Sequence, residues 1–209
     1  MSQFSRNEII KKIDKNESLE EEDVSFLDLS NIDFKKCDLS GATLTGAILT
    51  GSNLSGCNLT DAFMAEVKAE GANFSGAKMD DVFFQRGDIT GADFRAVTMV
   101  DASIFMMKCE GTIFDSAKMS GVKFLRSNMT GASFINAVME NSSLKGSDIQ
   151  DCNFQNANLT NCDMRQVRPQ GANFKDADTG GVLFYGKPPW GGESDDRDWA
   201  SELIYFQDE

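Results

Sequence analysis

Every fifth residue from Val24 to Phe184 is drawn from a narrow apolar set, and no insertion interrupts the register. Of these 33 positions, 29 are Leu, Phe, Met, Ile or Val, and two residues before each lies a second set that is mostly small. Side chains alternate along an extended backbone, so both sets face the same side. A period of five fits neither an α-helix nor a straight strand. We infer a chain that turns a corner once per pentad.

The spacing of like side chains indicates four pentads per turn. Most of the 18 glycines lie two residues after a large apolar position, where a backbone without Cβ turns at least steric cost. At a spacing of 20 residues, phenylalanines recur in one column and methionines in another. The predicted core contains Phe34, Phe74, Phe94, Phe114, Phe134, Phe154 and Phe174 in the first column and Met79, Met99, Met119 and Met139 in the second. Stacked in this way, the side chains would fill the interior and leave no channel.

The tandem pattern, seen in SGANFSGAKM, CNLTDAF and TGADFRA, resembles the pentapeptide-repeat family. The resemblance covers about three quarters of the chain. It implies an all-β fold, a right-handed quadrilateral parallel β-helix with type II and type IV turns at its corners. Thirty-three pentads give about eight coils, and at ~4.8 Å per coil the rod should be roughly 40 Å long.

The repeat divides the chain into three parts: an N-terminal cap over residues 1–23, the β-helix over 24–184, and a C-terminal segment over 185–209. Ser5 and Glu8 form a capping-box pattern that predicts a helix over about residues 6–15. Its apolar stripe of Ile9, Ile10 and Ile13 is expected to cover one end of the solenoid, as are Trp199, Leu203 and Phe206 at the other end, beyond a breaker-rich linker. The alternative for the C-terminal segment is dimerisation or partner docking.

All five cysteines fall on inward positions of the repeat. Cys37, Cys57, Cys152 and Cys162 occupy the small set, Cys109 occupies the large set, and none forms a CxxC pair. We therefore expect small buried hydrophobes with unreactive thiols, and no metal or disulfide framework.

Composition excludes several classes of function. Histidine is absent, which removes imidazole metal sites and Ser-His or Cys-His nucleophilic pairs. The net charge of −13 disfavours direct binding to nucleic acid. Outward carboxylates are frequent, but an uninterrupted rod has no long loop with which to build a cleft. We expect no catalytic residues, no metal and no cofactor. No apolar stretch reaches the length of a membrane span and no signal peptide is recognisable, so we expect a cytoplasmic protein.

A strip of apolar residues breaks the polar rule on the outside of the rod. On four successive turns of one side, the predicted interface consists of Phe63, Phe83, Phe105, Met106 and Leu125, bordered by Arg86 and Arg126. An apolar stripe with arginines at its rim is typical of a protein interface. Two alternatives remain: scattered outward apolar residues are normal, or a terminal segment folds over them.

These features favour a non-catalytic bacterial scaffold that binds another protein along one side or through its capped ends. The family resemblance implies an alternative, a DNA mimic that inhibits or protects DNA gyrase. Residues 24–184 carry 19 acidic and 14 basic side chains, a mixed surface far from the charge density of a duplex. A further alternative is an adaptor for secretion machinery, because the N-terminal arrangement is similar to family members encoded beside it. A homodimer through the C-terminal segment also stays open.

Overall fold

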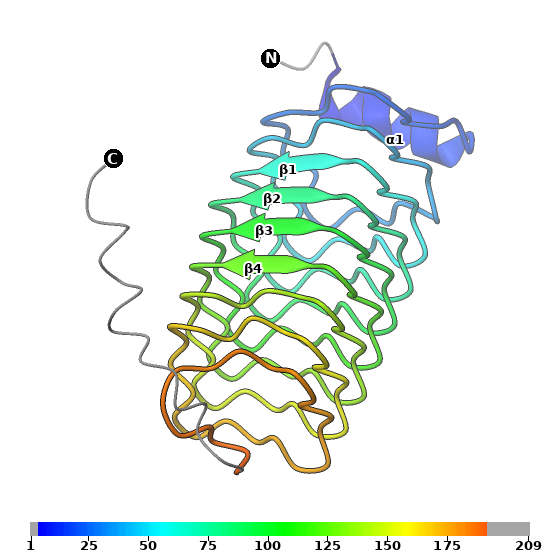
Figure 1. Cartoon of the computed structure of the whole chain (residues 1–209). Coiled ribbons are helices and arrows are strands. Elements are labelled where there is room, and N and C mark those ends of the chain that lie inside the picture. Colours follow the sequence, from blue (N-terminus) through cyan, green and yellow to red (C-terminus); the bar gives the residue numbers. More distant parts are fainter. Residues whose placement is uncertain (1–3, 192–209) are drawn as a thin grey trace.

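The chain folds as a four-sided parallel β-solenoid with one helix across its N-terminal end (Figure 1). The computed structural model describes residues 4–191. Parallel β-bridges join residues that are 20 apart, from Asp23 with Thr43 to Asp163 with Leu183. Each coil therefore contains four pentads, and the predicted β-helix is confirmed.

Four short strands stack in parallel on one side of the solenoid (Figure 1). They are β1 (Phe63–Ala65), β2 (Phe83–Gln85), β3 (Ser103–Phe105) and β4 (Lys123–Leu125), and each residue pairs with the residue 20 positions later. The strands contain only three residues because the next residue in every case adopts a positive φ, which turns the chain.

The corners repeat with the pentad. Every fifth residue from Glu21 to Gly186 has a φ between 53° and 76°. At most corners the N–H three residues after the large inward residue donates to its carbonyl, as from Ala42 to Leu39 at 3.1 Å. A positive φ at the third residue with this hydrogen bond defines a type II turn. Glycine adopts that conformation without steric cost, and Asn and Asp tolerate it better than other residues.

Aspartate or asparagine directly before many large inward residues stabilises the corner that follows. Asp38 Oδ1 accepts a hydrogen bond from the backbone N–H of Ser40 at 3.0 Å, and Asn73 Oδ1 accepts one from Ser75 at 2.9 Å. Asn58 also donates from Nδ2 to Asp38 Oδ1 in the coil above, at 3.0 Å. These side chains are local hydrogen bonders, as their place in the repeat indicates.

A column of packed rings runs through the interior, interrupted by Leu54 between Phe34 and Phe74. Successive phenylalanines of the predicted column stack with centroids 4.6 Å apart at Phe74–Phe94, 5.2 Å at Phe94–Phe114 and 5.0 Å at Phe114–Phe134. Phe124, from a neighbouring side of the coil, meets Phe114 edge to face at 5.5 Å. The structure buries all the predicted core residues, Phe34, Phe74, Phe94, Phe114, Phe134, Phe154, Phe174, Met79, Met99, Met119 and Met139.

Helix α1 (Arg6–Asp14) covers the N-terminal end (Figure 1). Both halves of the capping box are present, and Ile9 and Ile13 are buried whereas Ile10 is half-buried. Arg6 donates from Nη1 and Nη2 to the carbonyls of Asp28 and Ser30, at 2.5 and 2.7 Å. In the next coil, the carbonyls 20 residues later, those of Ile48 and Thr50, accept hydrogen bonds from the backbone N–H groups of the coil before it. The guanidinium thus replaces the coil that is missing at this end.

The coils begin before the boundary expected at residue 24. Leu19 is fully buried, and its N–H donates to the carbonyl of Asp38 at 2.8 Å in the ladder pattern. Leu19 lies five residues before Val24, so the apolar register of the repeat already extends to it, with Glu17 at the position of the small inward set. Residues 19–23 therefore belong to the first coil of the solenoid as well as to the N-terminal cap.

Trp190 packs against the last coil at the C-terminal end. Its ring meets Phe174 and Phe184 edge to face, with centroids 5.1 and 5.2 Å apart. Trp190 is not among the predicted end-cap residues, and Trp199, Leu203 and Phe206, which are, lie outside the described residues.

Candidate functional site

The predicted apolar strip lies on the side that carries β1–β4, which we call the sheet face (Figure 1). Phe63 and Phe83 are ladder partners whose rings stack at 4.8 Å, and Phe83 meets Phe105 at 6.0 Å. Phe105 is in turn the ladder partner of Leu125. The structure thus brings together, on neighbouring coils, side chains that are up to 62 residues apart in the sequence.

Solvent reaches every member of the strip. Phe63 is 42% exposed and Met106 is 45% exposed, whereas Phe83, Phe105 and Leu125 are half-buried. Single exposed apolar residues are common on protein surfaces, but contiguous patches mark interaction sites. The stacking distances make this a contiguous patch.

The corners that follow β2, β3 and β4 are built differently from most others. Here the N–H groups of Gly87, Met107 and Ser127 do not bond back across the turn. They donate to the next coil instead: Gly87 to Met107 Sδ at 2.9 Å, Met107 to Ser127 Oγ at 3.1 Å, and Ser127 to Ser147 Oγ at 3.0 Å. Because the turn bond is missing, the extended backbone continues past the large inward residue and presents a second outward column, that of Phe105 and Leu125.

Cations surround the strip, although the chain as a whole is acidic. The outward positions of the sheet face from Thr43 to Gln166 carry five basic residues and two acidic ones, namely Arg86, Lys123, Arg126, Lys145 and Arg165 against Glu66 and Asp163. Arg165 pairs with Asp163 at 2.7 Å. Within residues 4–191, no carboxylate forms an ion pair with Arg86, Lys123 or Arg126, and all three side chains are exposed.

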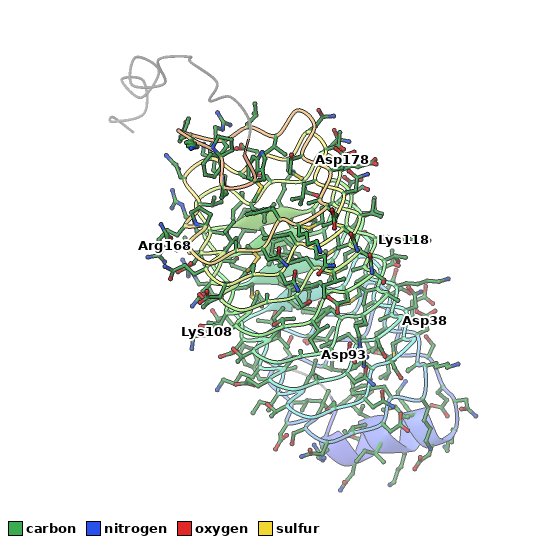
Figure 2. The ribbon with its side chains drawn as sticks, turned by 90° about the horizontal axis from the view of Figure 1, so that it is seen from below. Asp38, Asp93, Lys108, Lys118, Arg168 and Asp178 are labelled. Atoms are coloured by element: carbon green, nitrogen blue, oxygen red, sulfur yellow. The ribbon has the colours of Figure 1, made fainter. Side chains whose placement is uncertain are left out.

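The adjoining side, which we call the acidic face, has the opposite balance. Figure 2 shows Asp38, Lys118 and Asp178 along this side of the rod and Lys108 and Arg168 along the opposite side. The outward positions of the acidic face hold seven acidic residues and two lysines. They are Asp38, Asp61, Asp80, Asp81, Asp101, Glu140 and Asp178 against Lys78 and Lys118. The basic and acidic side chains of the rod are therefore separated onto different sides, and the net charge of the whole chain does not show this separation.

Sequence analysis missed Phe26. This side chain is 61% exposed, the largest fraction among the large apolar residues described by the structure. It lies in the same corner column as Arg86, Met106 and Arg126, and a Cβ at Gly46 would lie 2.5 Å from its Cδ1, so its ring covers that glycine. Spacing by multiples of 20 from Met106 was the signal that would have found it.

A shallow groove of about 280 Å³ adjoins the sheet face at the corner of Gly87. Its walls include Glu66, Lys68, Arg86 and Lys108, so both signs of charge line it. It lies directly beside Arg86, at the border of the strip. A side chain of a partner that contacts the strip would find space here.

All five cysteines were expected to be buried, but Cys37 is only half-buried because it lies near the N-terminal end of the rod. Four are buried, and burial raises the pKa of the thiols of Cys57, Cys152 and Cys162 to about 12. Cys152 and Cys162 donate their S–H to the carbonyls of Met129 and Met139, each at 2.9 Å. Among the residues that the structure describes, no group of three potential metal ligands is found, nor a helix long and apolar enough to cross a membrane.

Comparison with known proteins agrees with this architecture. The family description "Pentapeptide repeats (8 copies)" matches residues 28–64, 57–95, 112–151, 127–166 and 152–182, more than half of the chain. The chain belongs to the pentapeptide-repeat family. The quadrilateral coil, the apolar column and the positive φ at each corner are thus one instance of the right-handed β-helix of pentapeptide-repeat proteins.

The chain is similar to solved structures of pentapeptide-repeat proteins. QnrB1, described as a plasmid-mediated fluoroquinolone resistance protein, is similar with a TM-score of 0.70 at 22% identity, over 79% of this chain and 85% of QnrB1. HetL, from the cyanobacterium Nostoc sp. Strain PCC 7120 and involved in heterocyst differentiation regulation, is 19% identical with a TM-score of 0.42, over 87% of this chain and 98% of HetL. No curated protein sequence matches the chain. The similarity to QnrB1 shows the fold alone.

Proposed function

We propose that this pentapeptide-repeat protein is a non-catalytic scaffold that binds another protein through its sheet face. The observation that carries the proposal is the contiguous strip of stacked apolar side chains bordered by exposed cations without ion pairs among the described residues. A polar rim around an apolar centre is the anatomy of protein interfaces, and Phe, Met and Arg are enriched there. The rigid solenoid holds these side chains in place, so little conformational entropy is lost on binding.

The charges on the sheet face indicate the chemistry of the partner. Exposed cations around an apolar strip suit an acidic surface that contributes apolar side chains of its own. We therefore expect association to slow and weaken as salt concentration rises, because screening weakens long-range attraction between exposed charges.

A double substitution tests the proposal. We expect Phe83→Asp with Phe105→Asp to leave the β-solenoid folded and to abolish partner capture, because both side chains are outward and partly exposed. The matched control is Val100→Asp with Val138→Asp, two outward apolar residues of the acidic face that are 38% and 37% exposed. The measurement is quantitative mass spectrometry of proteins captured from native cells, with circular dichroism of each variant.

Capture of the same proteins by the sheet-face variant, or of none by the unsubstituted chain, would contradict the proposal. If Phe83→Asp with Phe105→Asp unfolds while the control does not, the two rings are structural and the interface lies elsewhere. Proteins lost only with the sheet-face variant identify the partner.

The acidic face favours a second candidate, inhibition or protection of DNA gyrase by mimicry of duplex charge. Seven carboxylates follow this side from Asp38 to Asp178. A supercoiling assay with purified gyrase, with and without a quinolone, tests it. The expected result is inhibition or protection that is lost when Asp80, Asp81 and Asp101 are changed to Asn. No effect of the unsubstituted protein at micromolar concentration removes this candidate.

A further inference from the structure

The described part of the chain leaves the sheet face incomplete. The ring of Phe63 is exposed and that of its stacking partner Phe83 is half-buried, and the guanidinium groups of Arg86 and Arg126 have no carboxylate partner within residues 4–191. Ordinary soluble surfaces pair or scatter such groups, because contiguous apolar patches promote association. The question is what lies on this face before a partner binds.

The residues that follow Gly191 have the complementary composition. Residues 192–209 contain seven acidic residues and one basic residue, with Trp199, Leu203, Ile204, Tyr205 and Phe206 among them. Acidic groups interspersed with aromatic and branched apolar side chains match a face that is apolar along its centre and cationic at its rim. The acidic face, with net charge of the same sign as this segment, would repel it.

Residues 192–209 also begin close enough to the sheet face to reach the strip. Leu183 continues the ladder column of Phe63 and Phe83, and Trp190 is held against Phe184 at the end of the last coil. Six coils separate Leu183 from Phe63, which is about 29 Å at ~4.8 Å per coil. Eighteen residues reach up to about 60 Å when extended and about 27 Å as a helix. The extended form reaches the whole strip, whereas a helix ends just short of Phe63.

We propose that residues 192–209 fold back along the sheet face of their own chain and cover the strip, with their carboxylates beside Arg86, Lys123 and Arg126. This goes beyond the scaffold function, because it assigns an occupant to the face in the absence of a partner. A tethered segment has a local concentration in the millimolar range, so weak contacts suffice to hold it. A partner must then displace an acidic, aromatic segment, which restricts binding to proteins with stronger matching chemistry.

Tryptophan fluorescence of the full-length chain reports the contact. In a Trp190→Phe background, Trp199 is the only tryptophan. We expect its emission to be blue-shifted and its quenching by acrylamide to be several-fold weaker than that of free tryptophan. Arg86→Glu with Arg126→Glu should move the emission to the red and restore quenching. The matched control, Lys78→Glu with Lys118→Glu on the acidic face, should change neither. Free quenching of Trp199 in the Trp190→Phe chain with Arg86 and Arg126 intact overturns the proposal.

Cross-linking locates the segment and identifies whose it is. The photoreactive amino acid p-benzoylphenylalanine, placed at position 206, is irradiated in the otherwise unsubstituted chain, and the products are mapped by mass spectrometry. We expect intramolecular links to peptides that contain Phe63, Phe83, Phe105 or Leu125. Links between two copies, detected as a doubled mass, overturn the proposal in favour of dimerisation, as do links confined to other sides of the rod. Partner capture through the sheet face is measured separately, so it can succeed or fail independently of these outcomes.

Discussion

Single inward side chains decide how each corner closes. Ser147 Oγ accepts the N–H of Ser127 at 3.0 Å and donates to the carbonyl of Phe124 at 3.0 Å, the two backbone groups that a closed turn would join to each other. Ser52 does the same between Ile32 and Leu29 in the first coils. The small inward set therefore supplies hydrogen bonds as well as volume. Sequence analysis recognised the volume alone, because the partner groups lie 20 to 23 residues away.

Substitution of Ser147 tests this role. Ser147→Ala leaves a buried N–H without its acceptor and should lower the free energy of unfolding by about 1–3 kcal/mol. The control is Ser142→Ala, one pentad earlier, because Ser142 Oγ only donates to the Met119 carbonyl, which also accepts the N–H of Val122. We expect it to cost about 1 kcal/mol or less. Urea unfolding measures both, and equal losses would refute the distinction.

The buried thiols predict a loss of stability in alkali. Burial raises the pKa of Cys57, Cys152 and Cys162 from an ordinary value of 9.0 to about 12. The folded state thus keeps protons that the unfolded chain releases above pH 9, so the stabilisation is complete below pH 9 and lost toward pH 12. Each thiol contributes a slope of up to about 1.4 kcal/mol per pH unit in that window.

Alanine is the natural control, because it is the commonest residue at these inward positions. We expect the triple variant Cys57→Ala, Cys152→Ala and Cys162→Ala to lose less free energy of unfolding than the original chain between pH 9 and 12. Urea titrations at several pH values measure this. Parallel stability curves for the two proteins would show that the thiols ionise equally in both states.

At the scale of elements, one coil is a unit that only its neighbours stabilise. Strands β1–β4 are three residues long and make ladders only with the coils above and below. Packing is also shared between coils: a Cβ at Gly87 would lie 2.6 Å from the Val67 carbonyl and 3.0 Å from Met107 Cε. At Gly87 these contacts run along the axis, to residues one coil before and one coil after. That result depends on stacking, which no local pattern encodes.

The central ring column should be the most sensitive part of the coil. Phe114 lies between Phe94 and Phe134, with centroids 5.2 and 5.0 Å away, and is fully buried. Phe114→Ala should cost about 3–5 kcal/mol in unfolding free energy, because neighbouring coils cannot collapse into the space. Phe26→Ala, the same substitution at an exposed corner, should stay within about 0.5 kcal/mol. Similar costs for both, measured by chemical denaturation, would contradict a packed axis.

At the scale of the whole molecule, the covering of the two solenoid ends is as important as the packing along the sides. Helix α1 covers the first coil through Ile9 and Ile13, and Arg6 takes up backbone carbonyls that would otherwise be unpaired. Trp190 covers the last described coil. Exposed solenoid ends present unpaired strand edges, which template association with another chain. Covering the ends of the described coils opposes end-to-end association.

Removal of the N-terminal cap should expose that edge. We expect Ile9→Asp with Ile13→Asp to detach α1 and cause end-to-end association, because the first coil then offers free backbone groups. Sedimentation velocity at several concentrations measures the assembly, and Ile10→Asp, at a half-buried site on the same helix, serves as the control. A double variant that stays folded at the original mass would show that the helix is dispensable for closure.

Much of this protein was determined by its sequence alone: the 20-residue coil, the inward phenylalanine column, the capping box at Ser5 and the side on which Phe63 and Phe83 lie. These follow from a local rule, five residues per corner, that repeats without interruption. Tertiary structure decided which corners open toward the next coil and how Arg6 and Trp190 close the ends. Each depends on groups brought together by stacking, or on an end where the repeat has no neighbour, so no period in the sequence could reveal it.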